Sequence, residues 1–180
     1  AEFFDLFYIG EGETVYDRLF DVYKEVRARG GSRQEFLEAA AEIEGIYVPS
    51  FYETTYHEDG TIRSFDPVNP HAKPVVHKQV VMEMQDTTYP EKPVVPFIKV
   101  TQDRVVLEIM RGCIRGCRFC QAGMLYRPTR ERDVEVLKDY AYKMLKNTGH
   151  EEIDLSSLSS SDYSEQKEQV TFQSEEFKDK

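Results

Sequence analysis

The stretch 105–123, VVLEIMRGCIRGCRFCQAG, joins an apolar run to all three cysteines of the chain, Cys113, Cys117 and Cys120. The apolar run, 105–110, predicts a strand that is covered on both faces, as in a parallel sheet. Loops that follow parallel strands gather at one edge of the sheet, where α/β proteins bind their ligands. We therefore expect the cysteine loop to be a functional site.

The cysteine spacing, CxxxCxxC, favours a metal cluster, because a short loop lets three thiolates converge on one inorganic centre. Iron–sulfur clusters are held by cysteine thiolates, usually four for a cubane cluster, so three would leave one iron open. Gly112, Gly116 and Gly123 suit a loop that wraps closely and adopts positive φ. Phe119, just before the last cysteine, should shield the cluster or flank whatever binds the open iron.

Structural zinc is the alternative interpretation of the same cysteines. Zinc accepts mixed Cys/His ligands, and a fourth ligand would come from His57, His71, His77 or His150. The chain would then be a metal-stabilised module that contacts RNA through the arginines around the cysteines.

The segment 111–132 holds six arginines and one acidic residue, a local charge of +5. Such a patch could offset an anionic cluster, bind a cofactor carboxylate or face an anionic substrate. We expect Arg130 and Arg132 to have structural roles. Glu108, inside the apolar run, should pair with Arg111 or another arginine, because a buried carboxylate needs a partner.

The overall composition disfavours two classes of partner. The net charge of −10, from 33 acidic and 23 basic residues, makes a general polyanion-binding surface unexpected. No apolar run approaches the roughly 20 residues needed to cross a bilayer, so we expect no membrane contact. An odd number of cysteines in one loop cannot form a disulfide framework and indicates a reducing, cytoplasmic compartment.

Hydrophobic periodicity predicts an α/β chain, mixed α+β if it is a fragment. Ser32 and Glu35 should form a capping box, Asp133 should cap a later helix, and Gly149 should end it. The expected elements are a strand at 3–9, helices at 15–29 and 32–45, a hairpin of 52–56 and 62–65, a proline-rich connector at 67–96, a second hairpin of 94–100 and 105–110, a helix at 134–147 and a parallel strand at 151–158.

These elements suggest three regions, 1–45, 46–103 and 104–180, with no role assigned to 163–180. The chain has no initiator Met and opens on an apolar run, so we expect it to be a fragment of a larger protein. Its second parallel strand would expose an unpaired edge, through which we expect the fragment to self-associate.

The cysteine motif, with an aromatic residue before the third cysteine and a strand ending in Arg-Gly-Cys, resembles the radical S-adenosylmethionine (SAM) superfamily. The wider segment RGCIRGCRFCQAGMLYRPTRER, 111–132, is similar to an uncharacterised branch in which a cobalamin-binding-like domain precedes the radical barrel. The segment FYIGEGETVYDRLFDVYKE, 7–25, resembles the end of that preceding domain.

The resemblance implies a function for each region. Region 1–45 would be the C-terminal end of a cobalamin-binding-like Rossmann domain plus a linker helix, and 46–103 a hairpin and connector. Region 104–180 would hold the first βα units of a partial (β/α)6 barrel, truncated after about two of its six units, so that the fragment alone would be inactive.

The resemblance also implies the cofactors. Cys113, Cys117 and Cys120 would hold a [4Fe-4S] cluster whose open iron is chelated by SAM, and one-electron reduction would produce a 5′-deoxyadenosyl radical that abstracts hydrogen from a substrate. Phe119 and the segment Ser159, Ser160, Ser161 and Asp162, which stands where the family has a Gly-Gly-Glu-like sequence, would bind SAM.

The partners follow from the same resemblance. The electron donor would be a flavodoxin or ferredoxin, and cobalamin would bind only the full-length protein. The full protein could be a methyl- or methylthiotransferase that modifies RNA or the ribosome, an expectation that rests on analogy alone.

Overall fold

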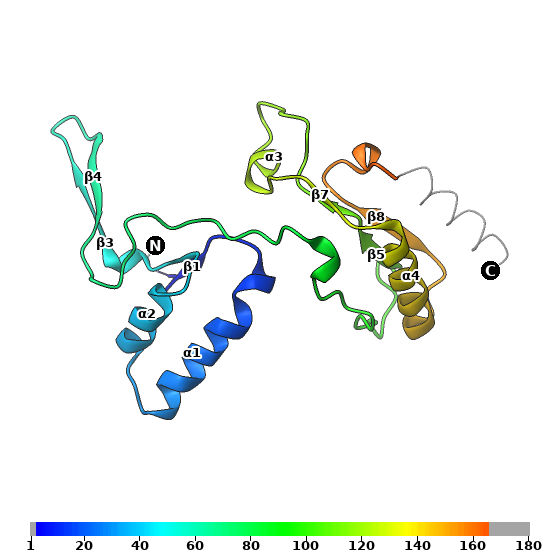
Figure 1. The fold of residues 1–180 in the computed structure, drawn as a ribbon, viewed down its shortest axis with the longest axis horizontal. Helices are drawn as coiled ribbons and strands as arrows, with labels where there is room; N and C mark the ends of the chain where they lie inside the picture. Colours follow the sequence, from blue (N-terminus) through cyan, green and yellow to red (C-terminus); the bar gives the residue numbers. More distant parts are fainter. Residues whose placement is uncertain (1–2, 166–180) are drawn as a thin grey trace. The chain divides into compact units, whose positions relative to one another are not determined.

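The computed structural model describes residues 3–165, and the chain divides into two compact units, 1–81 and 82–180 (Figure 1). Within the described residues every sheet has two strands. Helices and small sheets thus combine in a mixed α/β chain, as the hydrophobic pattern predicted. The three predicted regions remain predictions, and residues 166–180 lie outside the described part.

The first unit begins with a short strand, β1 (Phe7–Tyr8), which pairs antiparallel with β2 (Ile46–Tyr47). The predicted strand at 3–9 is shorter because its partner β2 has only two residues. Helices α1 (Tyr16–Ala28) and α2 (Arg33–Ala41) connect the two strands. The capping box is confirmed, since Ser32 Oγ accepts from the Glu35 N–H at 3.2 Å and the Glu35 carboxylate accepts from the Ser32 N–H at 2.7 Å.

A hairpin of β3 (Tyr52–Tyr56) and β4 (Ile62–Pro67) follows, with Gly60 at φ 81° in its turn, as predicted. The core of this unit consists of buried apolar side chains from the start of α1, from α2 and from the segment after α2: Val15, Leu37, Ala40, Ala41, Ile46, Val48 and Phe51.

The proline-rich connector contains no α-helix, in agreement with the sequence. Between β4 and β5 its regular elements are the 3₁₀ turn η3 (Met84–Asp86) and an isolated bridge from Gln79 to Gly10. Proline lacks the backbone N–H that helices and sheet ladders require, which explains the irregular path.

The second unit contains the predicted βαβ arrangement. Strands β5 (Val105–Glu108) and β8 (Ile153–Ser156) are parallel, and α4 (Val134–Thr148) connects them through the intervening chain and packs beside them (Figure 1). Its core consists of Val105, Leu107, Ile109, Met110, Val134, Leu137, Ala141, Met144 and Tyr163. Because β5 and β8 are parallel, the loops after both strands begin at the same edge of the sheet.

Both ends of α4 lie close to the predicted positions, but the predicted capping hydrogen bond at its N-terminus is not formed. The helix ends at Gly149, whose φ of 75° allows the left-handed cap. Asp133 makes no capping hydrogen bond, and its Oδ1 instead accepts from Gln85 Nε2 at 3.0 Å. Asp133 is thus the N-cap residue of α4, as predicted, but its side chain does not cap the helix and bonds Gln85 instead.

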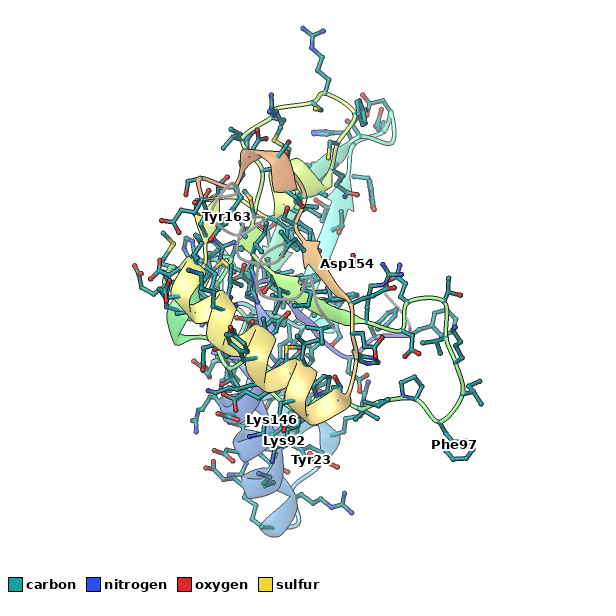
Figure 2. All side chains as sticks on the ribbon, turned by 90° about the vertical axis from the view of Figure 1, so that its right-hand side faces the viewer. Tyr23, Lys92, Phe97, Lys146, Asp154 and Tyr163 are labelled. Atoms are coloured by element: carbon teal, nitrogen blue, oxygen red, sulfur yellow. The ribbon has the colours of Figure 1, made fainter. Side chains whose placement is uncertain are left out.

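The predicted hairpin of 94–100 with 105–110 is also wrong. Segment 94–100 is not a strand, and Phe97 lies fully exposed in the loop that precedes β5 (Figure 2). The edge of β5 is instead occupied by Tyr89, whose hydroxyl donates to Val106 O at 2.7 Å and accepts from the Glu108 N–H at 3.0 Å. A single side chain thus satisfies backbone groups that a neighbouring strand would have paired.

Strand β5 is buried on one face only, against the prediction of two covered faces. Leu107 is fully buried, whereas Val106 on the opposite face is 36% exposed. Within the described residues, β8 pairs with β5 alone. The partial barrel and the self-association expected from the free edge of β8 remain predictions.

The chain then forms a second, antiparallel ladder of β6 (Met110–Arg111) and β7 (Arg130–Glu131). The loop between them carries the three cysteines and a single helical turn, α3 (Ala122–Leu125). Among the described residues, no helix combines the length and the apolar character that a membrane span needs.

Candidate functional site

The cysteine loop, defined here as residues 112–129, leaves the sheet between β6 and β7, which pair at its base. At that base Gly112 adopts φ 82°, and a Cβ there would lie 2.7 Å from Pro128 O and 2.8 Å from Tyr126 O. Gly116 and Gly123 do not have positive φ. Of the three glycines predicted to need this backbone conformation, only Gly112 adopts it, because the two sides of the loop meet there.

Arg130 holds the end of the loop. Its side chain is buried, and its guanidinium donates to Pro128 O at 3.0 Å and to Tyr126 O at 3.2 Å. Carbonyl groups that point into the base of the loop thereby gain partners. The structural role predicted for Arg130 is confirmed.

Arg132 is completely enclosed. Its guanidinium carbon lies 5.2 Å from the ring centroid of Tyr89 and 5.6 Å from that of Tyr140, and the guanidinium donates to Met84 O at 2.6 Å and to Thr87 Oγ1 at 3.0 Å. These contacts satisfy a buried cation through aromatic faces and oxygen acceptors. Its predicted structural role is confirmed too.

Glu108 forms the expected ion pair at the carboxyl end of β5. Arg111 donates from Nε to Glu108 Oε1 at 3.0 Å and from Nη2 to Oε2 at 2.9 Å, and Arg132 Nη2 lies 3.7 Å from Oε2. Two arginines thus surround one carboxylate, which gives Glu108 a structural role next to the base of the loop.

The three cysteines lie in the irregular part of the loop, and none of them forms a disulfide. Cys117 is exposed and the other two are partly exposed. Two sulfurs accept backbone hydrogen bonds: the Arg115 N–H lies 3.4 Å from Cys113 Sγ, and the Gly123 N–H 3.3 Å from Cys120 Sγ. In their number, type and access, these thiols suit an iron–sulfur cluster.

The three sulfurs do not form a site for a single metal ion in this conformation. Within residues 3–165, no three His, Cys, Asp or Glu side chains are grouped closely enough to hold one metal ion. Cys113, Cys117 and Cys120 therefore share one loop, and their role as common ligands stays a prediction.

Phe119 is 92% exposed, so it shields neither the sulfurs nor any other part of the loop in this conformation. Further apolar side chains of the loop are also exposed: Ile114, Met124, Leu125 and Tyr126. The loop thus presents an apolar surface beside its cysteines, and the predicted role of Phe119 in binding SAM remains a prediction.

The serine-rich segment, Ser159–Asp162, follows β8 at the same edge of the sheet and includes the 3₁₀ turn η4 (Ser160–Asp162). Ser160 Oγ lies 2.9 Å from Ser157 Oγ, and Ser159 Oγ donates to Asp162 Oδ2 at 2.6 Å. The segment is therefore organised by its own side chains.

Asp162 joins this segment to the cysteine loop. Arg115 Nε donates to Asp162 Oδ2 at 2.7 Å, and Arg115 Nη2 contacts Oδ1, so the guanidinium binds the carboxylate at two points. The pKa of Asp162 is held below its ordinary value mainly by the hydrogen bond from Arg115 and secondly by that from Ser159. The structure thus brings together two of the predicted site segments.

Two of the four histidines proposed as zinc ligands, His150 and His71, have other side-chain partners. His150 Nδ1 lies 3.6 Å from Asp103 Oδ1 at the amino ends of β5 and β8, beside a cavity of about 430 Å³ and opposite the edge that carries the cysteine loop. His71 Nδ1 lies 2.8 Å from Glu42 Oε1 within the first unit. Neither contact provides a fourth ligand for the cysteines.

The sequence pattern does not reveal the contact of Tyr89 with β5 or the partner of Arg115. Tyr89 lies in the proline-rich connector, where no periodic pattern marks it, and Asp162 was expected only to bind a cofactor. The cluster of arginines in 111–132 is the sequence signal for the contact between Arg115 and Asp162, because a buried carboxylate near these arginines would need a cation as its partner.

The comparisons with known proteins bear on the first part of the chain. A family model described as "Radical SAM proteins, N-terminal" matches residues 1–49. No curated protein and no solved structure matches the chain. The match covers almost the same residues as the predicted first region, 1–45, but its description does not mention cobalamin. Through these residues, the match supports membership of the chain in the radical SAM superfamily.

Proposed function

We propose that the cysteine loop binds a [4Fe-4S] cluster in a radical SAM enzyme of which this chain is a part. Cys113, Cys117 and Cys120 would supply the three thiolate ligands. The family match at residues 1–49 supports the superfamily, and the cysteine loop lies at the carboxyl edge of a parallel strand pair, where α/β folds bind cofactors.

The observation that carries the proposal is the contact between the cysteine loop and the serine-rich segment. Two chain segments that the resemblance assigns to one cofactor site follow β6 and β8 and are joined by the Arg115–Asp162 ion pair. We infer that Ser159, Ser160, Ser161 and Asp162 meet the methionine end of SAM. When bound, the reduced cluster would supply the electron that cleaves SAM to a 5′-deoxyadenosyl radical.

The residues of the chain have separate tasks in this proposal. The Arg115 and Gly123 N–H groups donate to cysteine sulfurs, and hydrogen bonds to sulfur are one of the factors that set the reduction potential of iron–sulfur clusters. Phe119 and the exposed apolar side chains near it would exclude water once a cofactor or another chain segment covers them.

Anaerobic reconstitution of the full chain with iron and sulfide tests the proposal. We expect a broad visible absorbance and about four iron and four sulfide per chain. The triple variant Cys113→Ser/Cys117→Ser/Cys120→Ser should lose both. Cluster absorbance that survives in this variant would refute the assignment of ligands.

Metal analysis after purification without chelators distinguishes a structural zinc site from an iron–sulfur cluster. One zinc per chain, lost in the same triple variant, would favour a metal-stabilised binding module over a cluster site. RNA affinity with a steep dependence on salt would then be the next observation to seek.

A further inference from the structure

Arg115 connects the cysteine loop to the serine-rich segment. Its backbone N–H donates to Cys113 Sγ at 3.4 Å, and its guanidinium binds the carboxylate of Asp162, 47 positions later in the sequence. One residue thus contacts a predicted cluster ligand and the serine-rich segment at the same time.

Asp162 is the fixed member of the pair. Its side chain is only 9% exposed, whereas that of Arg115 is 60% exposed. Ser159 donates to the same carboxylate at 2.6 Å, and the next residue, Tyr163, is buried and donates from its hydroxyl to Arg132 O at 2.7 Å. Ser159 and the buried neighbour Tyr163 therefore fix the position of Asp162, and the ion pair restrains the loop.

The part of the loop that carries the cysteines is irregular. The base is held by the β6–β7 ladder and by Arg130, whereas Cys113–Cys120 has no regular structure. Closing a loop around a cluster costs conformational entropy, and a contact that already restricts the loop lowers that cost. An ion pair between exposed side chains would contribute little, but this pair has two-point geometry and one nearly buried partner.

We propose that Arg115 is a positioning residue, whose ion pair with Asp162 holds the cysteine loop against the serine-rich segment so that Cys113, Cys117 and Cys120 can take up their cluster. The proposal rests on the proposed function for the identity of the cluster. The restraint on the loop exists without it.

Two variants of the full chain form a matched comparison. Arg115→Ala removes the pair, and Arg118→Ala removes an equal charge from an exposed residue of the same loop that makes no ion pair within the described part of the chain. Hydrogen exchange of the apoprotein gives the first measurement. In Arg115→Ala we expect exchange of the amides in 112–120 and 157–163 to rise about tenfold, while Arg118→Ala stays close to the wild type.

Cluster uptake gives the second measurement. After anaerobic reconstitution, Arg115→Ala should retain less iron per chain and show a changed reduction potential, because the sulfurs and their N–H donors lose their arrangement. Arg115→Lys should fall between Arg115→Ala and the wild type, since an ammonium keeps the charge but not the two-point contact. Asp162→Asn combined with Arg115→Ala should add little to either single change.

The outcomes separate the two proposals. A wild-type chain that takes up no iron, with exchange still faster in Arg115→Ala, would refute the proposed function and, with it, the role of the pair in cluster uptake, leaving only the restraint. Equal exchange in Arg115→Ala and Arg118→Ala would overturn the positioning role, even if the wild type binds a cluster. Full retention of iron and wild-type potential in Arg115→Ala would overturn it as well.

Discussion

The guanidinium of Arg132 lies 5.2 Å from the ring centroid of Tyr89, and the Tyr89 hydroxyl in turn bonds the backbone of β5. This relationship links the start of α4 to the proline-rich connector and to the edge of the sheet. Burial raises the pKa of Tyr89, so the hydroxyl keeps its proton and remains able to donate. Arg132 is therefore central to the stability of the second unit.

Replacing Arg132 with Met should lower the free energy of unfolding of this unit by about 2–4 kcal/mol, because Met84 O and Thr87 would lose their donor inside the core. Arg118→Met is the control and should change stability little, since that side chain is exposed. Native-state hydrogen exchange of α4 and β5 measures the difference. Equal protection in the two variants would contradict a structural role for Arg132.

Gly112→Ala should be strongly destabilising. The left-handed backbone costs about 1–2 kcal/mol for a residue with a Cβ. At Gly112 that Cβ would also meet two carbonyl oxygens within 3 Å, whereas at Gly149, with φ 75°, nothing lies within 4 Å.

Comparing Gly112→Ala with Gly149→Ala therefore separates the cost of a left-handed backbone, which both variants bear, from the cost of the steric contact, which only Gly112→Ala bears. We expect the first variant to lose more stability than the second in chemical denaturation followed by circular dichroism, and to expose its thiols to faster alkylation. If both variants behave alike, the close approach at the base of the loop is not important.

Ser32→Ala should destabilise α2 by about 1 kcal/mol, the usual cost of removing a serine N-cap. The hydroxyl accepts from the Glu35 N–H, and alanine would leave that donor to water. Hydrogen exchange of α2 in the variant measures the loss. Protection unchanged from the wild type would show that the capping box is not significant in solution.

The other half of the capping box predicts a pH dependence. The pKa of Glu35 lies below its ordinary 4.5, chiefly because the Ser32 N–H donates to the carboxylate and secondly because of the Ser32 side chain. Arg29 Nη2 also lies 4.0 Å from Glu35 Oε1. A carboxylate whose pKa is lower in the folded state stabilises the fold above its unfolded pKa. That contribution is lost as the pH falls through the folded value.

The comparison of the wild type with Glu35→Gln checks this direction. Glutamine can still accept the backbone hydrogen bond but carries no charge. The wild type should be the more stable at neutral pH, and the difference should shrink as the pH falls below 4.5. A difference that grows in acid would contradict the sign.

Local features of this protein were predictable from the sequence. The capping box at Ser32, the turn at Gly60, the helix before Gly149 and the clustered cysteines all depend on residues within a few positions of one another. Their patterns are periodic or compact, so they can be recognised without the fold. The βαβ unit followed from the same reasoning, because a strand, a helix and a strand must bury their apolar faces together.

Contacts between distant residues were decided by the tertiary structure alone. Tyr89 occupies the edge of β5 where a hairpin was expected, Gln85 takes the carboxylate of Asp133, and Arg115 binds Asp162 across 47 positions. Each depends on where the chain returns after a long connection, and such returns leave no repeating pattern in the sequence. The sequence by itself thus determined the elements and the thiols, whereas the packing of the chain decided which charged and aromatic side chains support them.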